Sequence, residues 1–113
     1  KQFQDSEIFA PNDYFSIPKQ QSFDYIIANP PFTPMRLGYK FLEDFFERSD
    51  NIIALMPWHS IINSEKRCLR YLEMGLKKVI HVPRRAFKGS RVQCCVMVFE
   101  RGYTGDINLD FVK

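Results

Sequence analysis

The sequence has few of the features that mark a secreted, metal-binding or membrane-spanning protein. Its three cysteines are odd in number and Cys94 and Cys95 are adjacent, so we expect no disulfide framework and a reducing, cytoplasmic location. Its two histidines, His59 and His81, lack a partner at a metal-ligand spacing, so no metal site is predicted. No apolar run approaches the roughly 20 residues that cross a bilayer, and the polar start shows no signal-peptide pattern. We therefore expect no membrane partner.

The bulk composition is that of an ordinary globular protein. A length of 113 residues allows one domain with one core, and 45% of the residues are apolar and 26% charged. The net charge of +3 permits contact with a polyanion without demanding it. The chain begins with Lys1 instead of Met, which is typical of a piece of a longer protein.

Apolar patterning predicts an α/β domain that follows a polar, turn-rich lead-in. Short apolar runs predict buried strands over residues 23–28, 51–56, 79–82 and 94–99, and an alternating segment predicts a last edge strand over 107–111. Amphipathic stretches predict helices over residues 38–48 and 63–75. The order of these elements indicates a mostly parallel sheet with helices on its faces. The loop over 84–91 is too short for a helical crossover, so the strands on either side of it should pair antiparallel.

One motif follows the first predicted strand directly, at the place where open α/β sheets bind ligands: Asn29-Pro30-Pro31-Phe32. Asn29 offers a side-chain carbonyl oxygen that can accept a hydrogen bond from an exocyclic amine. Pro30 lacks an N–H and has a locked φ, so its carbonyl can be held as a second acceptor. Two acceptors aimed at one amine direct its lone pair toward an incoming methyl group. Phe32 offers a flat apolar face on which a base can stack.

The run from Phe23 to Phe32, Phe-Asp-Tyr-Ile-Ile-Ala-Asn-Pro-Pro-Phe, resembles motif IV of the S-adenosylmethionine (SAM)-dependent adenine-N6 DNA methyltransferases. The resemblance implies a partial Rossmann-like methyltransferase sheet, SAM as cofactor, and methyl transfer to the N6 amine of an adenine flipped out of DNA. The catalytic motif would be Asn29, Pro30, Pro31 and Phe32, with Asn29 also touching the cofactor. Restriction–modification is the usual setting of that family.

Weaker similarities extend over residues 12–101. Asp13, within Asn-Asp-Tyr-Phe, resembles the acidic position that contacts the adenine of the cofactor, although a turn-capping aspartate would fit as well. Residues 54–57 resemble the family's next strand end, and Trp58 and His59 after it are expected at the rim of the site. Residues 87–99 resemble the later loop and strand that help to form the base pocket.

A basic loop lies just before the last of these strands. Its residues Arg84, Arg85, Lys88 and Arg91 are candidates for contact with DNA phosphates, and a solvated loop face is an equally good interpretation.

The family's glycine-rich strand-to-helix turn has no counterpart here, because none of the five glycines, at 38, 75, 89, 102 and 105, forms such a turn. We therefore interpret residues 1–113 as a single domain, the catalytic-motif half of a methyltransferase. A fragment is preferred over a split enzyme or a degenerate relative. The cofactor-binding half would be a preceding segment or a complementary subunit. Alone, the chain is expected neither to bind SAM nor to methylate DNA, and to self-associate through an open sheet edge.

Two other functions remain open. Methyltransferases of RNA guanine and of release-factor glutamine carry similar motifs, but the glutamine enzymes resemble Asn-Pro-Pro-Tyr, whereas Phe32 is found here. A non-catalytic DNA-binding or assembly module that has lost its cofactor half is the second alternative.

Overall fold

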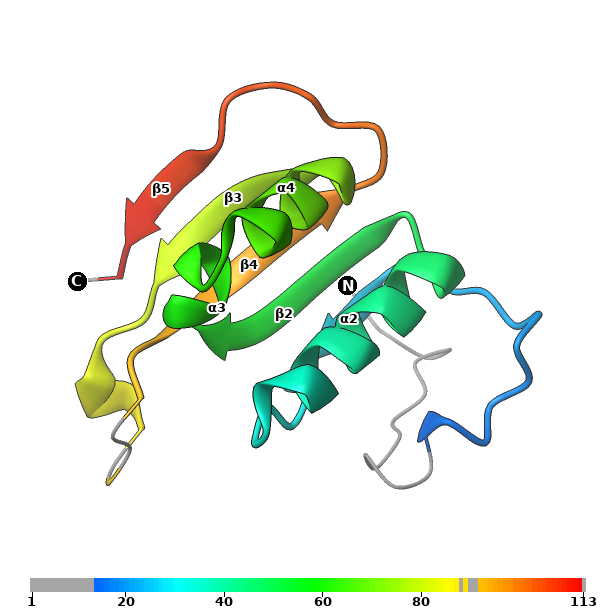
Figure 1. Cartoon of the computed structure of the whole chain (residues 1–113), viewed down its shortest axis with the longest axis horizontal. Helices are drawn as coiled ribbons and strands as arrows, with labels where there is room; N and C mark the ends of the chain where they lie inside the picture. Colours follow the sequence, from blue (N-terminus) through cyan, green and yellow to red (C-terminus); the bar gives the residue numbers. More distant parts are fainter. Residues whose placement is uncertain (1–13, 88, 90–91, 113) are drawn as a thin grey trace, which may run out of the picture.

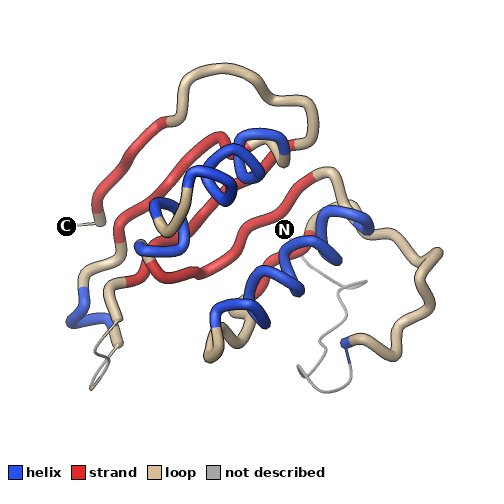
Figure 2. Tube along the Cα trace, in the orientation of Figure 1, coloured by secondary structure: helices blue, strands red, loops and turns tan. Residues whose placement is uncertain are grey.

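The computed structural model describes residues 14–87, 89 and 92–112. These residues form one five-stranded mixed sheet of order β1-β2-β4-β3-β5 (Figures 1 and 2). The strands are β1 (Ile26–Ala28), β2 (Asn51–Pro57), β3 (Leu76–His81), β4 (Cys94–Glu100) and β5 (Asn108–Phe111). The helices are α2 (Met35–Arg48), α3 (His59–Ile62), α4 (Glu65–Glu73) and a 3-10 turn, η1 (Arg84–Ala86).

Four of the described strands run in one direction, and β4 runs against them. β1 pairs parallel with β2, and β3 pairs parallel with β5, whereas β4 is antiparallel to both β2 and β3. The predicted antiparallel pair on either side of the basic loop is therefore confirmed, as is the last edge strand. We call the end of the sheet where β1, β2, β3 and β5 finish the carboxyl edge, and the opposite end the amino edge.

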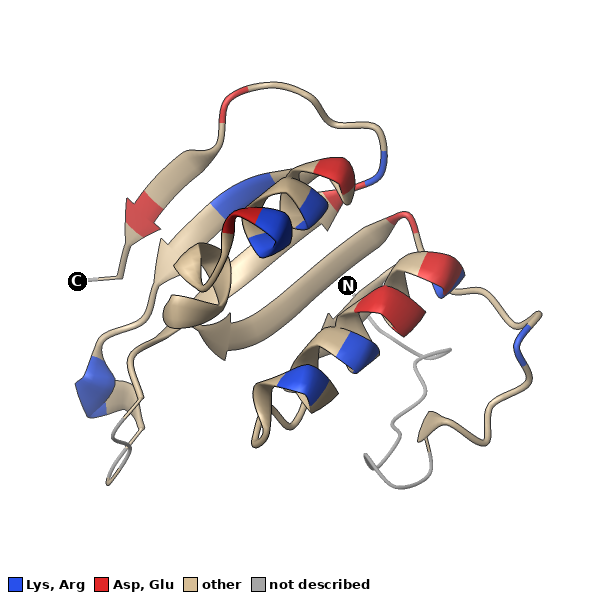
Figure 3. Cartoon of the chain, in the orientation of Figure 1, with Lys and Arg blue, Asp and Glu red and all other residues tan. Residues whose placement is uncertain are grey.

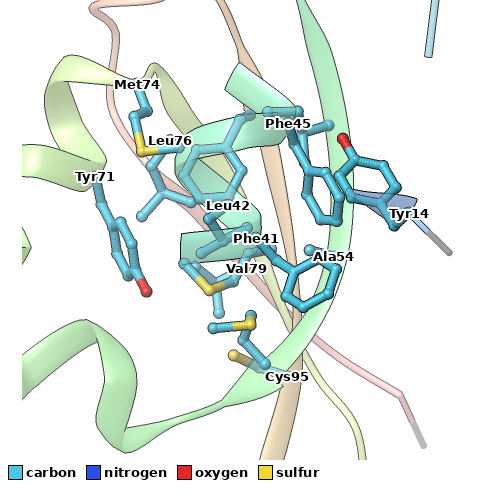
Figure 4. Close-up of a cluster of buried hydrophobic side chains, with 14 of the residues drawn as sticks. Tyr14, Phe41, Leu42, Phe45, Ala54, Tyr71, Met74, Leu76, Val79 and Cys95 are labelled. Atoms are coloured by element: carbon cyan, nitrogen blue, oxygen red, sulfur yellow. The ribbon is translucent and has the colours of Figure 1, made fainter. Parts of the chain in front are cut away.

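The core lies between the sheet and the helices α2, α3 and α4, which cover the same face of the sheet (Figure 1). Alternate residues of β2, namely Ile52, Ala54 and Met56, are buried toward the helices, as the period of a strand requires. Aromatic and aliphatic side chains from α2, α4, β3 and β4 complete the cluster (Figure 4). Each large side chain buried there contributes about 1.5–3 kcal/mol.

Helix α2 begins at Met35, earlier than the Gly38 that the sequence pattern predicts. Pro34 is its N-cap residue, and the Pro34 carbonyl oxygen accepts a hydrogen bond from the N–H of Leu37 at 3.0 Å. The last residue of α2, Arg48, is buried. The guanidinium donates to Asp44 at 2.7 Å and to the carbonyl oxygens of Ile17 and Pro18 at 3.0 and 2.8 Å. This network ties the lead-in segment to the amino-edge end of α2.

Helix α4 begins and ends as predicted. The hydroxyl of Ser64 accepts from the N–H of Arg67 at 3.1 Å, which caps the first turn. Gly75 ends the helix with φ +85°, and a Cβ there would lie 1.9 Å from the carbonyl oxygen of Glu100. Only glycine therefore allows the chain to turn from α4 into β3. None of the helices described is long and apolar enough to span a membrane.

The prediction that the first strand is buried is wrong. β1 is the end strand of the described sheet, and Ile27 is 73% exposed and Tyr25 63% exposed. Ile27 points to the face that carries no described helix, whereas Ile26 and Ala28 pack against the core. Self-association through the β1 edge stays a prediction.

Candidate active site at the carboxyl edge

The motif Asn29-Pro30-Pro31-Phe32 follows β1 at the carboxyl edge, where the sequence placed it. Asn29 is exposed, Pro30 is buried, and Pro31 and Phe32 are half-buried. The amide of Asn29 is therefore open to a ligand, while the prolines anchor the turn that carries it. The two prolines make this turn rigid, because neither can rotate about φ.

A glycine of α2 sets the position of the aromatic residue of this motif. A Cβ on Gly38 would lie 3.1 Å from Cβ and 3.4 Å from Cα of Phe32, and 3.3 Å from Cε of Met56. The backbone at Phe32 thus rests directly on the helix. Sequence reasoning missed this role. The sequence pattern placed Gly38 at the first position of the helix; only the observed start at Met35 shows that it lies inside, where glycine costs roughly 1 kcal/mol relative to alanine.

Trp58 follows β2 and joins it to the last residue of β3 and to the residue before β4. Its indole N–H donates to Nδ1 of His81 at 3.0 Å, and its backbone N–H donates to the carbonyl oxygen of Gln93 at 2.8 Å. The Gln93 side chain donates in turn to the carbonyl oxygen of Val82 at 2.6 Å. Trp58 therefore fixes the base of the basic loop. His59, the first residue of α3, is exposed beside it, so both residues lie at the rim as expected.

The basic loop leaves β3 at the same edge as the motif. Arg84 and Arg85 lie in η1 and are exposed (Figure 3). Lys88 and Arg91 lie outside the described residues. The structure thus places Arg84 and Arg85 at the same edge as the motif, and their contact with DNA stays a prediction.

Asp13, the candidate contact for the cofactor adenine, also lies outside the described residues. The residue after it, Tyr14, is buried against Phe41 and Phe45 of α2, with ring centroids 5.5 and 5.3 Å apart. Burial is the main reason that the pKa of Tyr14 is raised above its ordinary value. Tyr14 therefore belongs to the core, whereas Phe15 beside it is 39% exposed.

The described residues do not build a cradle for the methionine end of SAM. Gly75, Gly102 and Gly105 lie in connections at the amino edge. The space beside Gly38 is occupied by Phe32, and Gly89 belongs to the basic loop. Contact of Asn29 with the target amine and with the cofactor both stay predictions.

Other chemistries find little support at this edge. Burial raises the pKa of the Cys95 thiol to about 12, so it is neutral and unsuited to nucleophilic attack. Among the described residues, no three His, Cys, Asp or Glu side chains form a group that could hold a metal ion.

A depression of about 360 Å³ lies at the amino edge, away from the motif. Its charged lining is partly self-paired, since Arg101 bonds Asp50 at 2.7 Å and Arg48 is committed to Asp44. We therefore assign no ligand to it.

Comparison with known proteins shows the fold. No protein-family model and no curated protein matches the sequence. A chain from a structure of the type I restriction–modification system has a TM-score of 0.65 and 19% identity, covering 83% of this chain and 24% of that one. A Listeria monocytogenes protein, described as a class I SAM-dependent methyltransferase, has a TM-score of 0.65 and 12% identity, covering 81% and 37%. The predicted α/β class and partial Rossmann-like methyltransferase sheet are thus confirmed, and the chain spans well under half the length of either structure.

Proposed function

We propose that this chain is the catalytic-motif part of a SAM-dependent methyltransferase that acts on the N6 amine of adenine in DNA within a restriction–modification system. The observation that carries the proposal is the position of Asn29-Pro30-Pro31-Phe32. The motif follows a strand at the carboxyl edge of a methyltransferase-like sheet, with Asn29 exposed and Phe32 seated on α2.

Each residue of the motif would act on the target base. The side-chain oxygen of Asn29 and the carbonyl oxygen of Pro30 would accept the two N–H groups of the adenine amine. Held in this way, the nitrogen lone pair turns out of ring conjugation and is available to attack. Phe32 would stack on the flipped base and contribute roughly 1–3 kcal/mol. SAM, when bound, supplies the methyl group.

The cofactor would be held largely by another part of the enzyme, because the described glycines form no cradle for it. A preceding segment or a partner subunit would supply that part, and the similarity to a chain of a type I restriction–modification system supports such an arrangement. We call this chain together with its cofactor-binding part the assembled enzyme. DNA is the preferred substrate because Arg84 and Arg85 lie exposed at the same edge as the motif.

A methyl-transfer assay on the assembled enzyme tests the substrate. Radiolabelled SAM is offered with a DNA duplex, the same duplex with N6-methyladenine at every adenine, the matching RNA duplex, and a glutamine peptide. Label should enter only the unmodified DNA and be recovered as N6-methyladenine. Label in the RNA or in the peptide would favour one of the other amine substrates.

A further inference from the structure

The lysines and arginines in the described part of the chain differ in their ion pairing. One group is paired with acidic side chains within 4.0 Å: Arg48, Arg67, Arg70, Lys77, Lys78 and Arg101. The second group has no ion pair with any described acid: Lys19, Arg36, Lys40, Lys66, Arg84 and Arg85. Unpaired, exposed arginines are the side chains that remain free to bind an anion.

Three of the unpaired residues lie at the carboxyl edge, one beside the motif and two after β3. Arg36 is exposed in the first turn of α2, four residues after Phe32, and Arg84 and Arg85 lie in η1 after β3. Figure 3 shows the basic first turn of α2 and the basic η1 turn, both toward the carboxyl edge of the sheet. The end of β2, with Trp58, lies between them.

Arg36 lies where the α2 dipole disfavours a cation, whereas Arg48 in the last turn lies where the dipole favours one. The first turn of α2 has no acidic residue and contains Arg36, while its acidic residues Glu43, Asp44 and Glu47 lie in the second half (Figure 3). A cation at the amino end of a helix costs about 0.3–1 kcal/mol through the helix dipole. Helix stability therefore gives no reason for Arg36, and an external anion would.

We propose that Arg36 is a DNA-backbone contact and that Arg36, Arg84 and Arg85 form a basic rim that holds the target strand along the carboxyl edge, with Arg36 at the motif and the other two beyond Trp58. The inference rests on the proposed function and deepens it. β1 and β3 are three strand spacings apart, which is about 14 Å. Phosphates of one DNA strand advance about 3.4 Å each along the duplex axis, so the edge from β1 to β3 is about as long as four phosphate steps. The planar guanidinium can bind a phosphate through two parallel hydrogen bonds.

The rim is tested by the salt dependence of DNA binding. Fluorescence anisotropy measures the affinity of this chain for a short fluorescein-labelled duplex as NaCl increases. Arg36→Gln should reduce the slope of log K against log salt by about one. Over a fourfold range of NaCl concentration, the affinity lost by the variant relative to the unmodified chain should therefore be about threefold to fourfold greater at the lowest salt than at the highest. Arg36→Lys should keep most of the slope.

Lys19→Gln is the matched control. Lys19 is also exposed and lacks a described ion-pair partner, but it follows Pro18, whose carbonyl oxygen is bound by Arg48 at the far end of α2. Its slope should equal that of the unmodified chain, and circular dichroism should show both variants folded.

Equal slopes for Arg36→Gln and Lys19→Gln would overturn the inference. So would a chain that binds no duplex at the lowest salt, or polyglutamate that competes as well as DNA. If Arg36 controls binding but the methyl-transfer assay fails, the proposed chemistry is lost and the rim remains. If methylation is seen but Arg36→Gln leaves the salt dependence of DNA binding unchanged, only the proposal of the rim is refuted.

Discussion

Replacing Gly38 with alanine tests how the candidate site is held, because the structure predicts opposite effects on the helix and on the motif. The added methyl carbon would lie 3.1 Å from Cβ of Phe32, where ordinary carbon–carbon contacts are about 3.5–4.0 Å. The loop must therefore move away from α2 by about 0.4 Å or more. Met56, at 3.3 Å, can yield more easily because its flexible end is the contact.

The net stability change should be small. Alanine favours the helix by roughly 1 kcal/mol over glycine, while overpacking costs about 1–3 kcal/mol. We expect the free energy of unfolding, measured with urea, to fall by about 0–2 kcal/mol. In the assembled enzyme, 2-aminopurine fluorescence at the target position should nevertheless report a base that stacks poorly on the displaced Phe32.

A second variant separates the two contacts. Adding Met56→Ala to Gly38→Ala removes the methionine contact but leaves the one with the Phe32 backbone. The double variant should therefore keep the fluorescence defect. Gly38→Ala that gains the full helix-propensity stabilisation of about 1 kcal/mol, with an unchanged fluorescence signal, would refute this account of the loop.

Three further perturbations have defined outcomes. Phe32→Ala should cost roughly 1–3 kcal/mol in engagement of the flipped base, read by 2-aminopurine, whereas Phe32→Tyr keeps the ring; equal signals from both would make Phe32 a packing residue only. Arg48→Met should lower the free energy of unfolding by about 3–5 kcal/mol because it leaves Asp44 buried without its partner, and a loss below about 1 kcal/mol would show that the pair is dispensable. The Arg70 hydrogen bond lowers the pKa of Glu43, so its stabilisation should be present above the ordinary carboxyl pKa and be lost as the pH falls through the lowered value. Glu43→Gln should accordingly destabilise by less than about 1 kcal/mol at neutral pH and by nothing in acid, since Glu43 is 41% exposed; a cost that persists in acid would contradict the assignment.

The elements that local sequence determines could be predicted. The run 51–56 predicted β2, because its continuous apolar and β-branched residues fit a strand between two neighbours. Ser64 and Gly75 predicted the ends of α4, because a cap and a left-handed turn depend on residue type at one position. The motif was placed at the carboxyl edge because it directly follows the residues that predicted β1.

Features that depend on distant partners could not be predicted. The prediction that Ile27 is buried was wrong, because an apolar run does not reveal which strands lie beside it in the sheet. Helix α3 was missed because four residues are too few to show a helical period. The bond from Trp58 to His81 joins residues 23 positions apart, and Arg48 reaches the carbonyl oxygen of Ile17 31 positions away. Sequence spacing contains no signal for either.

The most direct test of the proposed chemistry is the single-turnover rate of the assembled enzyme after Asn29→Ala. Asn63→Ala is the matched control, because Asn63 is likewise exposed but its amide contacts the Tyr39 hydroxyl at 3.2 Å, outside the motif. Loss of one preorganised acceptor should slow methylation by about two orders of magnitude or more, with DNA affinity unchanged and Asn63→Ala close to the unmodified enzyme. A rate for Asn29→Ala near that of the unmodified enzyme would contradict the assignment of Asn29 as an acceptor for the target amine.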